Sequence, residues 1–309
     1  ATDENGYMRK QFPTWVDLLW TNKCNFACLG CKPSLSSTIA KSFSEEYSIL
    51  HNYQYNDKIN WNNSNDHKID YIVKNSDYIH TIHLNGGEPL MADDLYEFLD
   101  VMIKKGLHKK IRLWSHTNGS IKTYKGNDLI LDYFSQWGDN CKITISNDGH
   151  GDIGEYIRYG YRDNKWLETY NKIKDRKINH NVQTCINIFN ILYLKEIHDW
   201  YVENLDSSSW GKLSIWSNDP INIRMTNFVP DLKEQAIQIL SDLDGNNKMI
   251  KWDESLSSHR DWLEKNNDKK IDNLKSFYNG VIALDTKRKT DFQKTFPKLQ
   301  PLYDLGSTI

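Results

Sequence analysis

The sequence predicts an α/β protein: a partial (β/α)6 barrel of the TIM type with a helical C-terminal extension. Two observations predict this fold. Between residues 15 and 244, short β-prone apolar runs alternate with patterns typical of amphipathic helices, and six strands are counted. Beyond residue 245, helical patterns follow one another with no strand between them. Because repeated βα units build a parallel sheet, the first region is expected to form the barrel.

The chain of 309 residues is long enough for one large α/β domain and a modest extension. We expect an N-terminal arm at 1–14, the barrel at 15–244 and the extension at 245–309. The formal net charge of −2 gives no bulk electrostatic case for nucleic-acid binding. No apolar run approaches the roughly 20 residues that cross a bilayer, and the N-terminus shows no apolar segment typical of a secretory signal.

The expected elements follow in chain order. Residues 34–50 begin with a Ser-rich stretch, which suits a helix N-cap, and continue with helix-forming residues. Residues 52–66 are rich in Asn, Asp and Tyr, which predicts a loop. Strands are predicted at 15–20, 79–84, 110–115, 142–146, 181–189 and 221–227. Helices are predicted at 68–74, 93–105, 128–137, 164–174, 192–204 and 232–243, and in the extension at 252–265, 270–284 and 291–302.

Polar motifs stand at the C-terminal ends of the first four predicted strands. The first strand leads into CNFACLGC (24–31), and the next three end in NGGEP (85–89), HTNG (116–119) and SNDG (146–149). In barrels of this type the active site lies at the C-terminal ends of the strands. The motifs are therefore expected to meet at one site.

Three of the five cysteines, Cys24, Cys28 and Cys31, form the pattern C-x3-C-x2-C in the loop after the first strand. Three thiolates supply three corners of a metal centre, whereas a closed structural zinc site takes four ligands. A cubane [4Fe–4S] cluster held by three thiolates keeps one iron open to an outside ligand. The alternative is zinc with a distant fourth ligand, for which the candidates are His51, His67, Cys141 and Cys185.

The ordered motifs resemble the radical S-adenosylmethionine (SAM) superfamily. The resemblance covers residues 15–230, and it implies that the open iron binds the amino and carboxylate groups of SAM. The segments GEYIRYG (154–160) and CKPSLSS (31–37) are similar to the branch that carries SPASM or twitch extensions. One departure is Gly30, because the residue before the third cysteine is usually aromatic or bulky.

The resemblance implies a set of cofactor-binding residues, and each also has an ordinary structural reading. The GGEP residues, Gly86, Gly87, Glu88 and Pro89, would hold the SAM amino group. The alternative is that they form an ordinary turn. Thr117 and Asn118 would lie near the ribose or carboxylate, or would cap a strand end. Ser146 and Asp148 suit ribose hydroxyls, although N-D-G is strong turn chemistry. Arg158 would pair with the SAM carboxylate, or would be a surface arginine.

Alternation within the last two predicted strands gives candidates for the barrel interior. Gln183, Cys185 and Asn187 share one face of strand 181–189, and Arg224 lies on the polar face of strand 221–227. We expect Gln183, Asn187 and Arg224 to contact substrate. Cys185 is a candidate hydrogen-atom donor, against the alternative of an inert buried thiol.

SPASM and twitch extensions commonly bind further clusters, but after Cys31 this chain has only Cys141 and Cys185. We therefore predict one [4Fe–4S] cluster and one SAM, reduced by a flavodoxin- or ferredoxin-like donor in the cytoplasm. The resemblance implies hydrogen abstraction from a peptide or protein side chain, with a small metabolite or nucleoside as the alternative substrate. The alternative from another class is a non-catalytic metal-binding protein on the same barrel.

Overall fold

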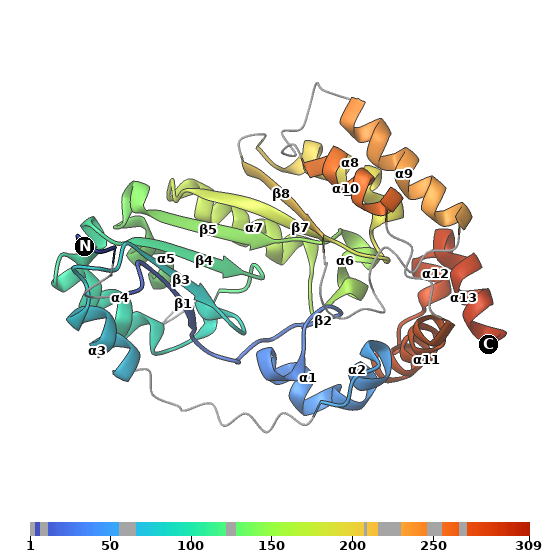
Figure 1. The fold of residues 1–309 in the computed structure, drawn as a ribbon, viewed down its shortest axis with the longest axis horizontal. Helices are drawn as coiled ribbons and strands as arrows, with labels where there is room; N and C mark the ends of the chain where they lie inside the picture. The colour runs from blue at the N-terminus through green and yellow to red at the C-terminus, as the bar shows by residue number, and fades with distance from the viewer. Residues whose placement is uncertain are drawn as a thin grey trace.

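The computed structural model describes residues 4–6, 12–55, 66–121, 128–206, 209–215, 230–245, 255–265 and 271–309. Its centre is a six-stranded parallel sheet in the order β1-β3-β4-β5-β7-β8 (Figure 1). The strands are β1 (Trp15–Leu19), β3 (Thr81–Asn85), β4 (Arg112–Thr117), β5 (Cys141–Ser146), β7 (His180–Ile186) and β8 (Trp210–Ile215). This sheet confirms the α/β class and the partial barrel.

The first five predicted strands are confirmed, and the sixth strand of the described sheet is a different one. β8 pairs with β7 at Trp210–Ile215, a segment that the sequence analysis did not assign to the sheet. The predicted strand at 221–227, including Arg224, lies outside the described residues.

The helices up to residue 245 are α1 (Ser37–Ser42), α2 (Ser44–His51), α3 (Asp66–Lys74), α4 (Leu95–Lys104), α5 (Leu129–Ser135), α6 (Gly151–Ile157), α7 (Asp163–Asp175), α8 (Leu194–Asn204) and α9 (Pro230–Gly245). α4, α5 and α7 connect strands and lie on one face of the sheet, whereas α1 and α2 lie below the sheet in the view of Figure 1. No helix in the described ranges is long and apolar enough to cross a membrane.

The two faces of the sheet differ in chemistry. Side chains that point toward the helices are apolar and buried, as in Leu84, Ile143 and Ile186. Side chains on the opposite, inner face are mostly polar, because strand residues alternate between faces. Gln183 and Cys185 stand on this inner face and are only partly buried, as the alternation predicted.

A two-stranded ribbon, which the sequence analysis did not predict, lies beside the cysteine loop. Its strands are β2 (Ala27–Cys28) and β6 (Arg158–Tyr159), and they pair antiparallel with Cys28 opposite Arg158. Two-residue strands carry too weak a periodic pattern to be found in a sequence. The ribbon joins the cysteine loop to the segment after α6.

The C-terminal residues are helical: α10 (Ser255–Lys265), α11 (Ile271–Arg288), α12 (Phe292–Thr295) and α13 (Gln300–Ser307). The expected single helix at 291–302 is wrong, because the chain breaks between α12 and α13 at Pro297. Proline lacks an N–H and clashes with the carbonyl four residues earlier.

α10 packs against α9 and β8, whereas α11 lies along α2 and α12 contacts α6 (Figure 1). Gly280 permits the close approach of α11 to α2, since a Cβ there would lie 2.4 Å from Leu50 Cα. The C-terminal helices therefore reach the back of the cysteine loop.

Candidate functional site

A cavity of about 580 Å³ opens at the C-terminal ends of β1, β3, β4 and β5. The predicted site residues that line it are Cys24, Cys28, Cys31, Gly86, Gly87, Glu88, Pro89, Thr117, Asn118, Ser146 and Arg158. Asp148, Gln183, Cys185 and Asn187 are absent from its lining, and Arg224 lies outside the described residues. One cavity therefore collects residues from four separate motifs.

The cysteine loop is held by hydroxyl groups at the start of α1. Ser36 accepts a hydrogen bond from Ile39 N, which confirms the expected Ser N-cap, and its hydroxyl donates to Phe26 O at 2.8 Å. The Thr38 hydroxyl donates to Cys24 O at 2.6 Å. The Ser-rich segment after the third cysteine therefore fixes the shape of the loop.

The three thiols are free of disulfides and influence one another. Burial raises the pKa of Cys24, and the neighbouring Cys28 raises it further. Burial and Cys28 also raise the pKa of Cys31 to about 12. For Cys28, burial raises the pKa while the guanidinium groups of Arg158 and Arg288 oppose the rise. Metal ligation by these thiols would therefore release protons.

Two of the four proposed zinc ligands, His51 and Cys141, are already hydrogen-bonded or lie far from the thiols. Within the described ranges, no group of three His, Cys, Asp or Glu side chains is arranged to hold one metal ion. Both ring nitrogens of His51 are occupied, Nε2 by Leu29 O at 2.7 Å and Nδ1 by Tyr55 Oη at 2.6 Å. Cys141 is at the opposite end of β5 from the cavity, about 16 Å away along the strand.

The GGEP glycines are packed against the start of the cysteine loop. A Cβ on Gly86 would lie 2.8 Å from Thr21 O, and one on Gly87 would lie 2.5 Å from Lys23 O. Both glycines have positive φ angles, 82° and 39°, which side chains disfavour. Glu88 N then donates to Lys23 O at 2.7 Å. The motif therefore holds the backbone just before Cys24.

Glu88, which lines the cavity, also holds two strand ends together, and its expected contact with an ammonium group stays a prediction. Its carboxylate is fully buried and accepts hydrogen bonds from the Thr117 hydroxyl at 2.8 Å and from Asn118 N at 2.5 Å. Burial raises its pKa to about 7, although these hydrogen bonds favour the ionised form. Glu88 therefore ties the end of β3 to the end of β4.

Asn118 connects the same strand end to the cysteine loop. Its Nδ2 donates to Asn25 Oδ1 at 3.2 Å and to Cys24 Sγ at 3.6 Å, and its Oδ1 accepts from Ser120 N. A hydrogen bond to a ligand sulfur influences the potential of an iron–sulfur centre. Asn118 is thus placed to act on the first cysteine of the motif.

Asp148 and Arg158 form a buried ion pair next to the second cysteine. Arg158 Nε lies 2.8 Å from Asp148 Oδ2, and Arg158 Nη1 donates to Cys28 Sγ at 3.6 Å. The other oxygen of Asp148 accepts from Cys185 N. Asp148 therefore positions Arg158, and its expected ribose contact stays a prediction. Burial is the largest single influence and disfavours the charge of Arg158, but Asp148, Cys28 and Cys185 together raise its pKa.

The remaining candidates lie on β7 or just after it. Asn187 is buried, and its amide donates from Nδ2 to Cys185 O and accepts from Phe189 N at Oδ1, as in a turn. Its expected substrate contact stays a prediction. Burial first, and Asp148 next, raise the pKa of Cys185 to about 12, so its thiol stays protonated. Gln183 stands on the inner face one strand from Ser146.

The inner face of β1, β3 and β4 carries a group of aromatic and polar side chains that were not among the predicted site residues. His83 stacks on Trp114 with ring centroids 4.4 Å apart, and its Nδ1 lies 2.6 Å from Asp17 Oδ1. His116 lines the cavity, and burial lowers its pKa to about 4. The alternation applied to the last two strands would have found them on the first three.

The sequence of residues 18–205 matches the family described as the Radical SAM superfamily. The chain belongs to the radical SAM superfamily. Members of this superfamily use a [4Fe–4S] cluster and S-adenosylmethionine. Comparison with curated protein sequences gives no match.

Solved radical SAM structures share the fold. SuiB of Streptococcus suis bound to S-adenosylmethionine has 13% identity and a TM-score of 0.50, covering 77% of this chain and 49% of SuiB. Native anSMEcpe with bound AdoMet has 17% identity and a TM-score of 0.51, covering 84% and 65%. SuiB bound to precursor peptide SuiA has 12% identity and a TM-score of 0.52, covering 77% and 47%. This radical SAM chain therefore spans about half to two thirds of their length.

Proposed function

We propose that Cys24, Cys28 and Cys31 hold one [4Fe–4S] cluster, with S-adenosylmethionine bound in the cavity beside it, and that the enzyme abstracts a hydrogen atom from a peptide or protein side chain. When bound and reduced, these cofactors supply a 5′-deoxyadenosyl radical. A flavodoxin- or ferredoxin-like protein in a reducing compartment, the cytoplasm, would provide the electron. The protein itself supplies position and exclusion of water.

The observation that carries this proposal is the shared cavity. Thiols of one loop face the same space as GGEP after β3, Thr117 and Asn118 after β4, and Ser146 at the end of β5. A zinc-binding scaffold would explain the three cysteines. It would not explain why the ends of three further strands surround them.

Within this cavity, different residues of the chain are suited to different groups of S-adenosylmethionine. The backbone of Gly86 and Gly87 presents carbonyl groups suited to an ammonium group, and Ser146 presents a hydroxyl suited to a ribose. The Arg158 guanidinium is oriented by Asp148 and is the cation suited to a carboxylate. Glu88 fixes the two strand ends on which these groups stand.

The inner face of the sheet is the proposed substrate surface. His116 connects the cavity to the stacked rings of His83 and Trp114, and Gln183 lies across the sheet. Such a surface, aromatic with hydrogen-bonding groups, suits a peptide side chain. The SPASM/twitch-like motifs and the likeness to SuiB, solved with its precursor peptide, support the same class. Arg224 stays a proposed substrate contact. Cys185, which is protonated beside Asp148, stays the proposed hydrogen-atom donor.

The test is anaerobic reconstitution of the purified chain. We expect about four irons per chain and formation of 5′-deoxyadenosine with dithionite. Replacing Cys24, Cys28 and Cys31 together with Ala should abolish both, because no other described cysteine stands on this loop. Cys141→Ala is the matched control and should keep both, since Cys141 is buried at the far end of β5.

Iron and deoxyadenosine formation that survive the triple substitution would refute the cofactor assignment. Stoichiometric zinc that iron cannot replace would favour the metal-binding scaffold. A peptide substrate is checked separately, by mass spectrometry of candidate peptides after turnover. A small metabolite or nucleoside consumed instead would refute the substrate class and leave the cofactor assignment standing.

A further inference from the structure

A buried arginine from the C-terminal helices lies directly behind the cysteine loop. Arg288, the last residue of α11, is 6% exposed. Its Nη2 donates to Ala27 O at 2.8 Å and to Tyr47 Oη at 2.7 Å, and its Nη1 donates to Tyr156 O at 3.1 Å. Ala27 lies between the first two cysteines of the motif, so this side chain contacts the loop that carries the thiols.

The charge of Arg288 has no carboxylate partner within ion-pair distance in the described part of the chain. Asp285, one turn earlier on the same helix, instead accepts hydrogen bonds from Thr290 and from Phe292 N. The guanidinium is enclosed by the rings of Phe43, Tyr47 and Tyr159 at 4.7 to 5.6 Å. Its Nε is buried without a hydrogen-bond partner. A buried cation of this kind is costly unless an anion lies nearby.

The proposed cluster ligand next to this contact is Cys28, which follows Ala27 in the chain. Arg158 Nη1 donates to Cys28 Sγ at 3.6 Å and Arg288 donates to Ala27 O, so the two guanidinium groups approach the loop from different elements, β6 and α11. Three ligand thiolates outweigh the charge of an oxidised cubane core, so the assembled centre is anionic, and one-electron reduction adds a further negative charge. Net charge near a cluster is one of the factors that set its potential.

We propose that Arg288 is the counter-cation of the iron–sulfur cluster, supplied by the C-terminal helices to the cysteine loop of the barrel. The inference rests on the proposed cluster at Cys24, Cys28 and Cys31. It gives the C-terminal helices a role in the redox chemistry: their last long helix delivers a positive charge that stabilises the reduced centre.

The experiment measures the midpoint potential of the reconstituted full chain by redox titration with electron paramagnetic resonance, together with the iron content. Arg288→Met removes the charge, and we expect a more negative potential and severalfold lower iron retention. Arg288→Lys keeps the charge and loses the forked hydrogen bonds, and we expect a potential near that of the parent with reduced iron retention. If the Met variant does not fold, Arg288→Gln, which still donates to Ala27 O, replaces it.

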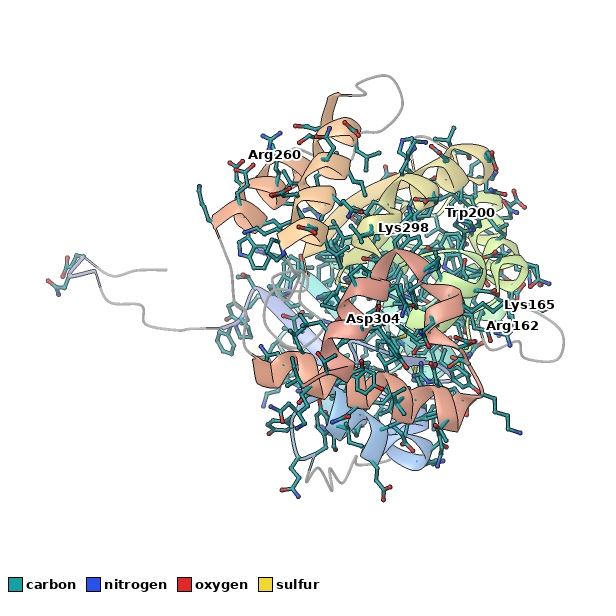
Figure 2. All side chains as sticks on the ribbon, turned by 90° about the vertical axis from the view of Figure 1, so that its right-hand side faces the viewer. Arg162, Lys165, Trp200, Arg260, Lys298 and Asp304 are labelled. Atoms are coloured by element: carbon teal, nitrogen blue, oxygen red, sulfur yellow. The ribbon has the colours of Figure 1, made fainter. Side chains whose placement is uncertain are left out.

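The matched control is Lys298→Met. Lys298, labelled in Figure 2, also stands in the C-terminal region. It donates to a backbone carbonyl, Leu192 O, at 2.9 Å and to Glu196 of α8, and it lies 4.6 Å from the Tyr193 ring. We expect this variant to keep the parent potential. Circular dichroism of each variant shows whether it has folded.

Three outcomes are distinguishable. A folded Met or Gln variant with the parent potential overturns the inference and leaves the proposed cluster intact. A Lys variant shifted as far as the Met variant also overturns it, since the charge would then not be the cause. A parent chain that binds no iron at the three cysteines overturns the proposed function, and this inference with it.

Discussion

At the scale of single residues, several candidate site residues bond to one another and so hold the loops of the site together. Glu88 bonds to Thr117 and Asn118, and Asp148 orients Arg158. Each is buried, and each stands at the end of a strand whose motif marked it as a candidate ligand. The polar groups at a strand end can both hold neighbouring loops and contact a cofactor. They need hydrogen-bond partners within the protein even when no cofactor is bound.

Glu88 gives a prediction about pH. Burial raises its pKa from 4.5 to about 7 in the folded chain. A carboxyl group with a raised pKa adds stability at acid pH, fully present below its unfolded pKa and lost as the pH rises through the folded value. The amount is about 3 kcal/mol, since a tenfold change in proton affinity is worth about 1.4 kcal/mol. The loss therefore falls between pH 4.5 and about pH 7.

The measurement is urea unfolding of the cluster-free chain at several pH values, for the parent and for Glu88→Gln. The amide does not titrate, so the free energy of unfolding of the parent relative to this variant should fall by about 3 kcal/mol as the pH rises across this range. The parent therefore has its largest relative stability at acid pH. Stability curves of the two proteins that run parallel from pH 4.5 to about pH 8 would contradict the pKa assigned to Glu88.

At the scale of elements, the cysteine loop is fixed by its neighbours on every side. GGEP packs against its start, α1 hydroxyls hold its turn, and β6 pairs with β2 across from Cys28. α2 carries Tyr47, whose hydroxyl donates to Ala27 O at 2.5 Å, and α11 packs on α2. The position of the thiols therefore depends on the contact between these two helices.

Gly280 tests that contact. Alanine is favoured over glycine inside a helix by about 1 kcal/mol, but here its Cβ would lie 2.4 Å from Leu50 Cα. Because backbone cannot move aside as a side chain can, we expect Gly280→Ala to destabilise the chain by about 1 to 3 kcal/mol in thermal or urea unfolding. Asn279→Ala, an exposed neighbour on the same helix, is the control and should be neutral or stabilising. A stabilised Gly280→Ala would show that α11 and α2 are not in close contact.

At the scale of the whole molecule, the barrel and the C-terminal helices share the site. α11 supplies Arg288 to the cysteine loop, and α12 contacts α6, which precedes β6. The sequence predicts a boundary at residue 245, between the barrel and the extension. Contacts cross this boundary in the structure, because α10 packs on α9 and β8.

A chain that ends after Lys265 tests this coupling, because it keeps every strand of the described sheet and lacks α11, α12 and α13. We expect it to bind a hydrophobic dye more strongly and to retain severalfold less iron, since the apolar side of α2 would lose its cover. The full chain is the control for both readings. Full iron retention by the shortened chain would show that the barrel holds the cluster by itself.

The sequence by itself determined the α/β class, five of the six described strands and the three thiols proposed to bind the cluster. These features are local: strand alternation, and three cysteines in eight residues, need no information about distant parts of the chain. The positions of GGEP, HTNG and SNDG at strand ends also followed, because parallel strands place their C-terminal ends at one edge.

Only the tertiary structure decided which predicted site residues line the cavity and which hold its loops in place. Asp148 and Arg158 are ten residues apart, and nothing local predicts that they pair beside Cys28. Arg288 is 261 residues from Ala27, yet the two are hydrogen-bonded. Such contacts depend on packing between elements, and their burial, which sets the charge state of each group, exists only once the chain has folded.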